Sequence, residues 1–544
     1  MAFPSRGLSH RSTVTGRRGL VAAAHPLASL AGVRILLEGG NAIDAAVATA
    51  AALNVAEPYM SGIGGVGYMH IYSARDGEHK VCDYVGLTPA AADLSLYTDR
   101  EQQSLGPLSP LVPGACAGWM EALRRYGSMD AAAVFAPAIE LAEGGFPLTV
   151  KNDWFFESCA AGLRRFPESA RTYLVDGSSP GPGGVLVQQD LAQTFRTVAA
   201  EGPDVFYGGA IGDAIAAHMA ESGGLLTKED LVANEPAWLD PVGVGYRDWT
   251  IFAPPPPCQA VQYLQTLKIL EGFDIGAMGH NTAETLHTFI EAVKLACVDR
   301  IHYTAIDDPP TAGLLSEGYA AERRRLIGAE AAVHVGDTFR PDPQEGEAGA
   351  GDPRAWTKTE CTTHFDTIDA DGNAVACTQS LGSGFGSAMV VPGTGVTLNN
   401  FMNWFDAVEG SPNAIGPSKK NEMCVSPAQV WDADGLRLLI GTPGSYGILQ
   451  TTPQMIMNVL DHGMNVQAAI EAPRIKAGRT RRVEVESRVP SEVLADLERR
   501  GHEIHHLGDW SPGVGGGQGI HVDPDSGAFM GGADPRRDGY ALGC

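Results

Sequence analysis

Basic residues are scarce in this chain of 544 residues, which has 39 lysines and arginines against 64 aspartates and glutamates and a formal net charge of −25. The electrostatic field of this negative net charge repels phosphate backbones and anionic lipid headgroups, so we expect neither nucleic acid nor a membrane surface as a partner. Long apolar runs are lacking as well. No uncharged stretch approaches the roughly 20 residues that span a bilayer, and no signal-peptide core follows the basic residues of positions 1–18. These absences predict a soluble, cytoplasmic protein.

Paired cysteines are also missing. The nine cysteines are odd in number, lie scattered between Cys82 and Cys544, and form no C-x-x-C pair. This pattern argues against a disulfide framework and against a thiolate zinc site. The hydrophobic fraction of 44%, by contrast, is large enough to bury an extensive core.

Apolar periodicity predicts helices over 42–54, behind an Asn41 cap, and over 282–300. A third helix is expected to begin at Pro453, with Thr452 as its cap, and to end near Gly463. Strand-like runs recur between these helices, at 66–73, 436–440 and 482–486. The mixture predicts an α/β protein in which helices cover sheets.

One β-hairpin brings two hydroxyls together. Residues 362–368 have strand composition, 369–373 form a turn cluster, and 374–381 again read as a strand. A five-residue loop would place Thr362 opposite Ser380. A slip of one residue would change this pairing, and Thr–Ser pairs in sheets often only satisfy one another. Directly upstream, residues 340–354 are rich in Pro, Gly and acid, which predicts a mobile linker over about 340–361.

The sequence resembles the gamma-glutamyltranspeptidase family through several long motifs in the right order. Beside the T-T-H-F of the hairpin, the matching segments are 22–32 (AAAHPLASLAG), 39–48 (GGNAIDAAVA), 57–69 (EPYMSGIGGVGYM), 398–400 (LNN), 441–445 (GTPGS) and 532–539 (GADPRRDG). The resemblance covers nearly the whole chain. It implies a four-layer αββα fold of the N-terminal-nucleophile hydrolase type.

The resemblance also implies a precursor that cuts itself between Cys361 and Thr362. Two subunits result, residues 1–361 and 362–544, which stay associated; whether they assemble further into homo-oligomers is left open. The freed α-amine of Thr362, with an ordinary pKa of about 7.7–8, would act as base for the Thr362 hydroxyl. Ser380 matches the hydroxyl that hydrogen-bonds the nucleophile, and the backbone N–H groups of Gly444 and Ser445 match the oxyanion hole. Thr363 is the rival nucleophile, but strand alternation points it to the opposite face.

This sequence departs from the family where classical members hold the glutamyl group. They use an Arg in D-F-R-E, an Asn after the helper hydroxyl, a Gln and an Asp after N-N, and a Ser-Ser pair. The corresponding positions here are Val85, Gly382, Phe401, Trp404, Met423 and Cys424. A substrate carboxylate in a buried pocket without a cationic partner would cost several kcal/mol. The segment 406–420 is also too short for the lid loop of some members.

From these substitutions we expect a small-molecule amide substrate whose acyl group is not ordinary γ-glutamyl. Cephalosporin acylases, oxamate amidohydrolases and enzymes of antibiotic biosynthesis show that the family scaffold accepts other acyl groups. One alternative is a true γ-glutamyl hydrolase or transpeptidase whose anchors come from other positions. Another is a binding protein that has lost catalysis. The sequence leaves open whether the acyl group passes to water or to an amine. It also leaves open whether the bond that is cut is an amide or a carbon–carbon bond.

Three other motifs lack the structural context that their chemistry needs. His502–His506 matches H-E-x-x-H, but the histidines are expected in a strand, where four residues span roughly 13 Å, too far for one zinc ion. Gly62–Gly67 matches G-x-G-x-x-G without the preceding strand of a dinucleotide site. Gly177–Gly181 matches G-x-S-x-G but reads as a loop. We therefore expect no metal and no cofactor.

Overall fold

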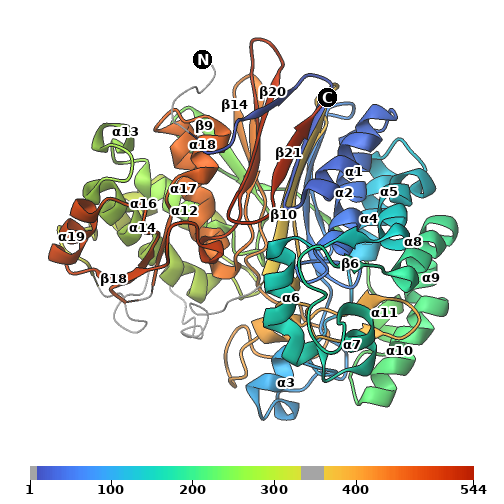
Figure 1. Ribbon diagram of the computed structural model, residues 1–544. Helices are drawn as coiled ribbons and strands as arrows, with labels where there is room; N and C mark the ends of the chain where they lie inside the picture. Colours follow the sequence, from blue (N-terminus) through green and yellow to red (C-terminus); the bar gives the residue numbers. More distant parts are fainter. Residues whose placement is uncertain (1–8, 333–360, 479) are drawn as a thin grey trace.

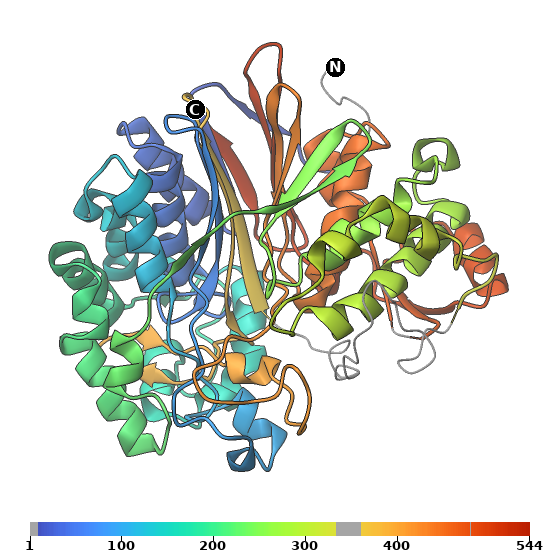
Figure 2. The same ribbon diagram turned by 180° about the vertical axis from the view of Figure 1, so that it is seen from behind.

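Two facing seven-stranded sheets form the centre of the computed structural model, which describes residues 9–332, 361–478 and 480–544 (Figure 1). The first sheet has the order β21 (Tyr540–Gly543), β2 (Gly19–Ala23), β10 (Cys361–Asp369), β11 (Ala374–Gly382), β3 (Val66–Ser73), β4 (Glu78–Asp83), β7 (Ala237–Leu239). The second has the order β1 (Val14–Gly16), β20 (Phe529–Ala533), β19 (Gln518–Val522), β15 (Gly435–Gly441), β14 (Ala428–Asp432), β9 (Trp249–Ala253), β8 (Val242–Tyr246). Figure 2 shows the chain passing from β7 of one sheet to the green β8–β9 hairpin at the edge of the other.

Helices cover the outer face of each sheet, which completes an αββα sandwich and confirms the expected fold class (Figure 1). The first sheet is covered by α1 (Pro26–Leu37), α2 (Ala42–Ala56) and α4 (Ala115–Tyr126), with α5 (Ala131–Gly144) and α8 (Gln189–Glu201) packed outside them. The second is covered by α12 (Val261–Leu270), α17 (Ile448–Leu460) and α18 (Val466–Glu471), with α14 (Ala283–Tyr303) outside them. No described helix is both long and apolar enough to cross a bilayer.

Three buried clusters match the three interfaces between these layers. The alanines of α2 allow it to lie close to the first sheet, in one large cluster with α5 and α8. A small cluster that includes Leu20, Ile368 and Leu439 separates the two sheets. The third lies between the second sheet and α12, α14 and α17. Apolar side chains on both faces of each sheet therefore hold the layers of the sandwich together.

Two of the three expected helices agree with the structure, and one start was wrong. Asn41 caps α2 in a capping box, and Thr282 caps α14. The third helix, α17, begins at Ile448 rather than at Pro453, because it continues directly from a 3-10 turn at Ser445–Gly447. Pro453 then falls at the sixth position of the helix.

Buried histidines make the fold sensitive to acid. His25 caps α1 and is 1% exposed, and burial lowers its pKa to about 4. The unfolded chain binds this proton near pH 6.5 and the folded chain only near pH 4. Neutral His25 therefore makes its full contribution to the free energy of unfolding above pH 6.5, and this contribution is lost as the pH falls toward 4.

We expect that His25→Gln reduces the loss of unfolding free energy between pH 7 and pH 4.5 by up to about 3 kcal/mol relative to wild type. Urea unfolding at both pH values measures this difference. Equal pH dependence in the two proteins would show that His25 is not held neutral by burial.

Candidate active site

Thr362 lies at a β-bulge at the start of β10, in the middle of the first sheet. Strand β10 pairs with β11 from Ile368, opposite Ala374, to Thr363, opposite Gln379, which is the register expected from a five-residue loop. The register then shifts, so that Cys361 lies opposite Gly382. The bulge lets Thr362, which is 2% exposed, leave the regular ladder and turn its side chain toward Ser380.

A short chain of hydrogen bonds joins the two hydroxyls to the peptide bond before Thr362. The Thr362 hydroxyl donates to Ser380 Oγ at 3.3 Å, and Ser380 Oγ donates to the carbonyl oxygen of Cys361 at 2.6 Å. The backbone N–H of Gly382 donates to Ser380 Oγ at 2.8 Å, which fixes the serine. The expected contact between Thr362 and Ser380 is therefore present, and it includes the carbonyl of the peptide bond that the resemblance marks for cleavage.

The Thr363 side chain points away from the hydrogen bonds between Thr362, Ser380 and the Cys361 carbonyl. Its hydroxyl donates to Glu57 Oε2 at 3.3 Å. Glu57 follows the last turn of α2 and is 1% exposed. Burial raises the pKa of Glu57 to about 7, an effect that the Arg537 guanidinium opposes. The alternation expected from the sequence thus separates the environments of the two threonines.

The turn after β15 presents the backbone of Gly444 and Ser445. Gly444 has φ 129° and Ser445 has φ 57°, a conformation in which a residue with a side chain is strained. Gly441 brings this turn close to β10, because a Cβ there would approach the imidazole of His364 to 2.4 Å. Among the described residues, neither the Gly444 N–H nor the Ser445 N–H has an acceptor. Two fixed donors are thus available on the turn after β15, the strand whose last residue packs on His364 of β10.

Arg537 also reaches the start of β10, although no sequence pattern predicted this contact. Its Nη1 donates to the carbonyl oxygen of Thr362 at 3.1 Å and to Met60 Sδ at 3.2 Å. Gly516 packs on the arginine side chain, since a Cβ there would lie 2.7 Å from Arg537 Cδ. The sequence feature that could have pointed to Arg537 is the motif G-A-D-P-R-R-D-G, in which two adjacent arginines occur in an acidic chain.

The residues expected to form the substrate pocket fall mainly in one cluster. Phe401 and Trp404 lie with ring centroids 6.2 Å apart, and Trp404 lies 4.9 Å from Tyr446, which follows Ser445. Val85, Phe401, Trp404, Met423 and Cys424 are all buried in the cluster over the second sheet. Gly382 has φ 102°, and a Cβ there would approach Asn400 Oδ1 to 2.0 Å. Apart from Gly382, these positions thus share one buried apolar cluster, and Trp404 links this cluster to Tyr446, the residue after the Gly444–Ser445 turn.

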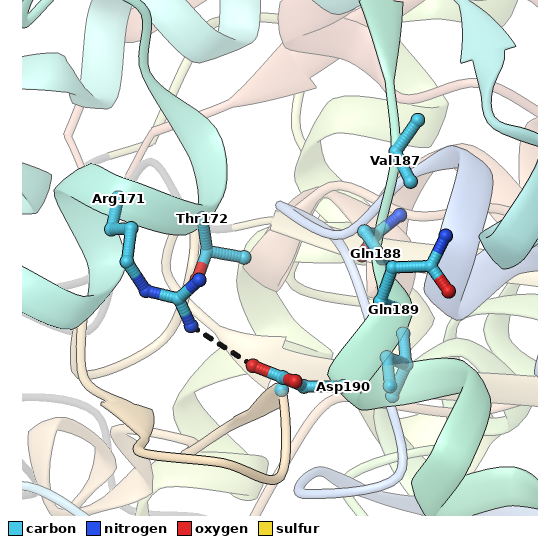
Figure 3. A pocket seen from close by; sticks show the side chains of 8 residues that line it. Arg171, Thr172, Val187, Gln188, Gln189 and Asp190 are labelled. Carbon is cyan, nitrogen blue, oxygen red and sulfur yellow. Dashed lines mark hydrogen bonds and ion pairs between the residues drawn. The ribbon is translucent and has the colours of Figure 1, made fainter.

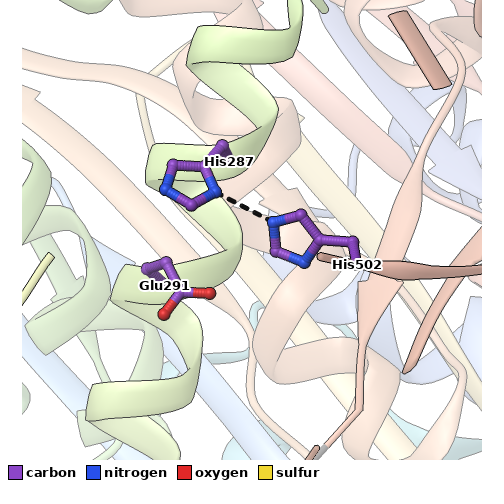
Figure 4. A group of neighbouring side chains, drawn as sticks. All are labelled: His287, Glu291 and His502. Atoms are coloured by element: carbon purple, nitrogen blue, oxygen red, sulfur yellow. Dashed lines mark hydrogen bonds between the residues drawn. The ribbon is translucent and has the colours of Figure 1, made fainter. Parts of the chain in front are cut away.

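A separate group of buried side chains has ligand atoms within 4.8 Å of one another, namely His287, Glu291 and His502 (Figure 4). His287 Nδ1 lies 2.9 Å from His502 Nε2, and the other ring nitrogen of His287 bonds the carbonyl of Gly328. The buried Lys294 ammonium donates to Glu291 at 2.8 Å. That positive charge already compensates the carboxylate and repels a second cation, so the group is better suited to join α14 to the segment before β18 than to hold a metal.

The H-E-x-x-H motif itself does not form a helical metal site. Its last four residues form β18 (Glu503–His506), as expected, after α19 (Ser491–Arg499). His502 is buried against His287, whereas His506 is exposed. The two histidines therefore lie in different environments.

A surface cavity near α8 is too small to serve as the reaction site, and it is not lined by β10 (Figure 3). Its volume is about 120 Å³, below the roughly 300–1,000 Å³ of ligand pockets. The Arg171 guanidinium and the Asp190 carboxylate, 2.9 Å apart, form an ion pair there. None of its lining residues belongs to β10, β11 or the turn after β15.

Comparison with known proteins identifies the class and then the family. The chain is similar to the acylase ACY 1 proenzyme of Pseudomonas sp. (strain V22), with 38% identity over 97% of this chain and 94% of that protein. It is 33% identical to the glutathione hydrolase proenzyme of Bacillus subtilis (strain 168), over 98% and 93% of the two chains. The structure of a cephalosporin acylase from Bacillus halodurans superposes with a TM-score of 0.89 at 34% identity, covering 100% of this chain and 98% of that one.

These likenesses, together with the αββα sandwich, define an enzyme of the N-terminal-nucleophile hydrolase class. The family model for gamma-glutamyltranspeptidase matches residues 28–544. The chain belongs to the gamma-glutamyltranspeptidase family.

Proposed function

We propose that the chain cuts itself before Thr362 and then uses this residue as the nucleophile of an amide hydrolase or acyltransferase. The observation that carries the proposal is the hydrogen-bond chain from Thr362 through Ser380 to the Cys361 carbonyl. A hydroxyl that donates to this carbonyl polarises it toward attack, and the attacking hydroxyl belongs to the next residue. The proenzyme names of the acylase and glutathione hydrolase relatives are in keeping with such a cut.

The cut proceeds by an acyl shift. Thr362 Oγ1 attacks the Cys361 carbonyl carbon, the C–N bond breaks as the hydroxyl proton passes to the departing nitrogen, and an ester forms between Cys361 and the threonine oxygen. Water then hydrolyses this ester, which leaves a carboxylate on Cys361 and a free amine on Thr362. Residues 1–361 and 362–544 become separate chains.

Both fragments contribute strands to both sheets, which supports their remaining together. Strand β10 of the smaller fragment pairs with β2 of the larger one, and β11 pairs with β3. In the second sheet, β14 pairs with β9 and β20 pairs with β1. Separation would expose the interiors of both sheets to water.

In the mature enzyme the α-amine of Thr362 accepts the proton of its own hydroxyl as the oxygen attacks a substrate amide. The N–H groups of Gly444 and Ser445 stabilise the oxyanion, an effect worth about 3–4 kcal/mol per donor in other enzymes. The leaving amine departs with a proton and an acyl ester remains on Thr362. Water, or a second amine, then takes the acyl group.

The acyl group is proposed to differ from ordinary γ-glutamyl. Val85 stands where the family has its glutamyl-binding arginine, and it lies with Phe401, Trp404, Met423 and Cys424 in one buried apolar cluster, which supports an apolar acyl pocket. The 38% identity to an acylase and the 34% identity to a cephalosporin acylase structure support an acyl group of another kind. The 33% identity to a glutathione hydrolase keeps γ-glutamyl transfer as the second candidate.

Mass spectrometry of the small subunit tests the proposed reaction. The mature enzyme is incubated with a panel of aliphatic, aromatic and γ-glutamyl p-nitroanilides and then quenched in acid. We expect an acyl adduct on the peptide that begins at Thr362, and faster turnover of a substrate other than γ-glutamyl-p-nitroanilide. Turnover of the γ-glutamyl substrate at the rate of a typical family member would refute the altered acyl group, and an adduct elsewhere would refute the nucleophile.

Loss of the Ser380 hydroxyl should slow both cleavage and turnover. In Ser380→Ala the Thr362 hydroxyl loses its acceptor and the Cys361 carbonyl loses its donor, so we expect both rates to fall by about 10²- to 10³-fold. Ser380→Thr keeps the hydroxyl and serves as the control, with both rates largely retained. A time course on a denaturing gel measures cleavage, and wild-type rates in Ser380→Ala would contradict the role of the hydrogen-bond chain.

A further inference from the structure

Arg537 is a nearly buried cation that has no carboxylate partner in the described part of the chain. Its side chain is 5% exposed, and its Nε is buried without a hydrogen-bond acceptor. The adjacent Arg536 differs, because it forms ion pairs with Glu486 and Asp534. Among the described residues, no carboxylate oxygen lies within 4.0 Å of Arg537. A desolvated guanidinium without a counter-ion is costly, so a site that retains one is a candidate for binding an anion.

Two acidic groups near Arg537 compensate its charge only in part. Burial raises the pKa of Glu57 to about 7 even though the Arg537 charge opposes this shift, so the charged form of Glu57 is disfavoured. Burial also raises the pKa of Asp538, whose carboxylate is engaged by the Thr149 hydroxyl and lies near Lys151. The positive charge at Arg537 is therefore available to a ligand beside Thr362.

Aromatic side chains border the guanidinium on the side of α6 (Val150–Leu163). Arg537 Cζ lies 5.7 Å from the ring centroid of Phe155, which stacks on Tyr59 at 4.5 Å. Trp154, whose ring lies 4.7 Å from that of Phe155, is 54% exposed. Figure 1 shows α6 beside the start of β10, which is the lower end of that strand in this view. A cation backed by aromatic rings, one of them open to solvent, thus lies next to the nucleophile.

We propose that Arg537 is the anion anchor of this enzyme and binds a carboxylate on the substrate, a role that rests on the proposed function of Thr362. It would take the place of the arginine that Val85 has replaced, but from the C-terminal segment rather than from the segment that follows β4. Its Nη1 already bonds the Thr362 carbonyl, so a carboxylate held by the same guanidinium would be fixed close to the nucleophile. Charge-assisted hydrogen bonds of this kind are about twice as strong as neutral ones. The preferred substrates are therefore amides that carry a carboxylate.

Three matched anilides test the proposal and locate the carboxylate. Pentanoyl-p-nitroanilide is neutral, glutaryl-p-nitroanilide carries a carboxylate on the acyl part, and pentanoyl-3-carboxy-4-nitroanilide carries one on the amine part. Wild type should prefer one of the charged substrates to the neutral one. In Arg537→Gln we expect kcat/KM for that substrate to fall by about 30- to 100-fold, mainly through KM. For the neutral amide, the factor by which kcat/KM falls should be at most a tenth of that for the charged substrate. Arg537→Lys should retain part of the preference for the charged substrate.

Lys151→Gln removes a nearby, half-buried charge and is the matched control, with the preference for the charged substrate retained. Equal losses for all three substrates in Arg537→Gln would overturn the proposal and leave Arg537 as a group that only orients Thr362. No preference of wild type for either charged amide would overturn it as well.

Binding to the mature protein separates this proposal from the reaction itself. Calorimetric titration with glutarate should show saturable binding that weakens in Arg537→Gln and Arg537→Lys, whereas glutaramide should not bind measurably. Failure of all amides to acylate Thr362 would refute the proposed function but leave this titration valid. Equal binding of glutarate to wild type and to both variants would refute the anion site alone.

Discussion

Thr362→Ala is expected to remain a single chain of 57.2 kDa on a denaturing gel and to lose activity by at least about 10⁴-fold. The substitution removes the hydroxyl that donates to Ser380 beside the Cys361 carbonyl, so the acyl shift has no nucleophile. Without the shift no α-amine is released, and the base of the later reaction is lost together with its nucleophile. One substitution thus removes two functions, which explains the size of the expected effect.

Thr363→Ala is the matched control, because the two threonines are neighbours with different contacts. The Thr363 hydroxyl donates to Glu57 and takes no part in the chain through Ser380. We expect this variant to be cut and to remain active. If Thr363→Ala were uncut while Thr362→Ala gave two fragments, the assignment of the nucleophile would be reversed.

Arg536→Met is expected to lower the free energy of unfolding by about 3–5 kcal/mol. Arg536 is fully buried and donates to both carboxylate oxygens of Glu486, at 2.8 and 2.6 Å, and to Asp534 at 3.1 Å. Arg474, also fully buried, donates to the same Asp534. Methionine fills much of the space but leaves the Glu486 carboxylate short of positive charge in a dry interior.

Thermal unfolding of the mature enzyme measures this loss. Arg34→Ala serves as the control, because the Arg34–Glu140 pair is exposed and should contribute less than about 1 kcal/mol. An Arg536→Met protein with the wild-type midpoint would mean that the pairs around Glu486 and Asp534 do not hold the C-terminal segment in place. Since that segment carries Arg537, the variant is also expected to reduce activity.

The β10–β11 hairpin shows which features of the site the sequence alone can predict. Strand composition around a five-residue turn was enough to predict the register of β10 and β11, because the pairing of an antiparallel hairpin follows from its loop length. The contact between Thr362 and Ser380 followed from the same rule. The bulge at Thr362 did not, since it depends on tertiary contacts that no local pattern encodes.

Arg537 and the start of α17 depended on packing between distant segments. Arg537 lies 175 positions from Thr362, and only the folding of the C-terminal strands brings the two together. Pro453 is a common first residue of helices, yet here the preceding 3-10 turn at 445–447 fixes an earlier start. The linker expected over 340–361 lies, except for Cys361, outside the described residues and stays a prediction.

End-group sequencing combined with the intact mass of active enzyme tests the central claim most directly. The proposed mechanism predicts two chains, one ending at Cys361 and one beginning with Thr-Thr-His-Phe, whose masses add up to that of the full chain plus one water. Fully active material that contains an uncut bond between Cys361 and Thr362 would contradict the mechanism.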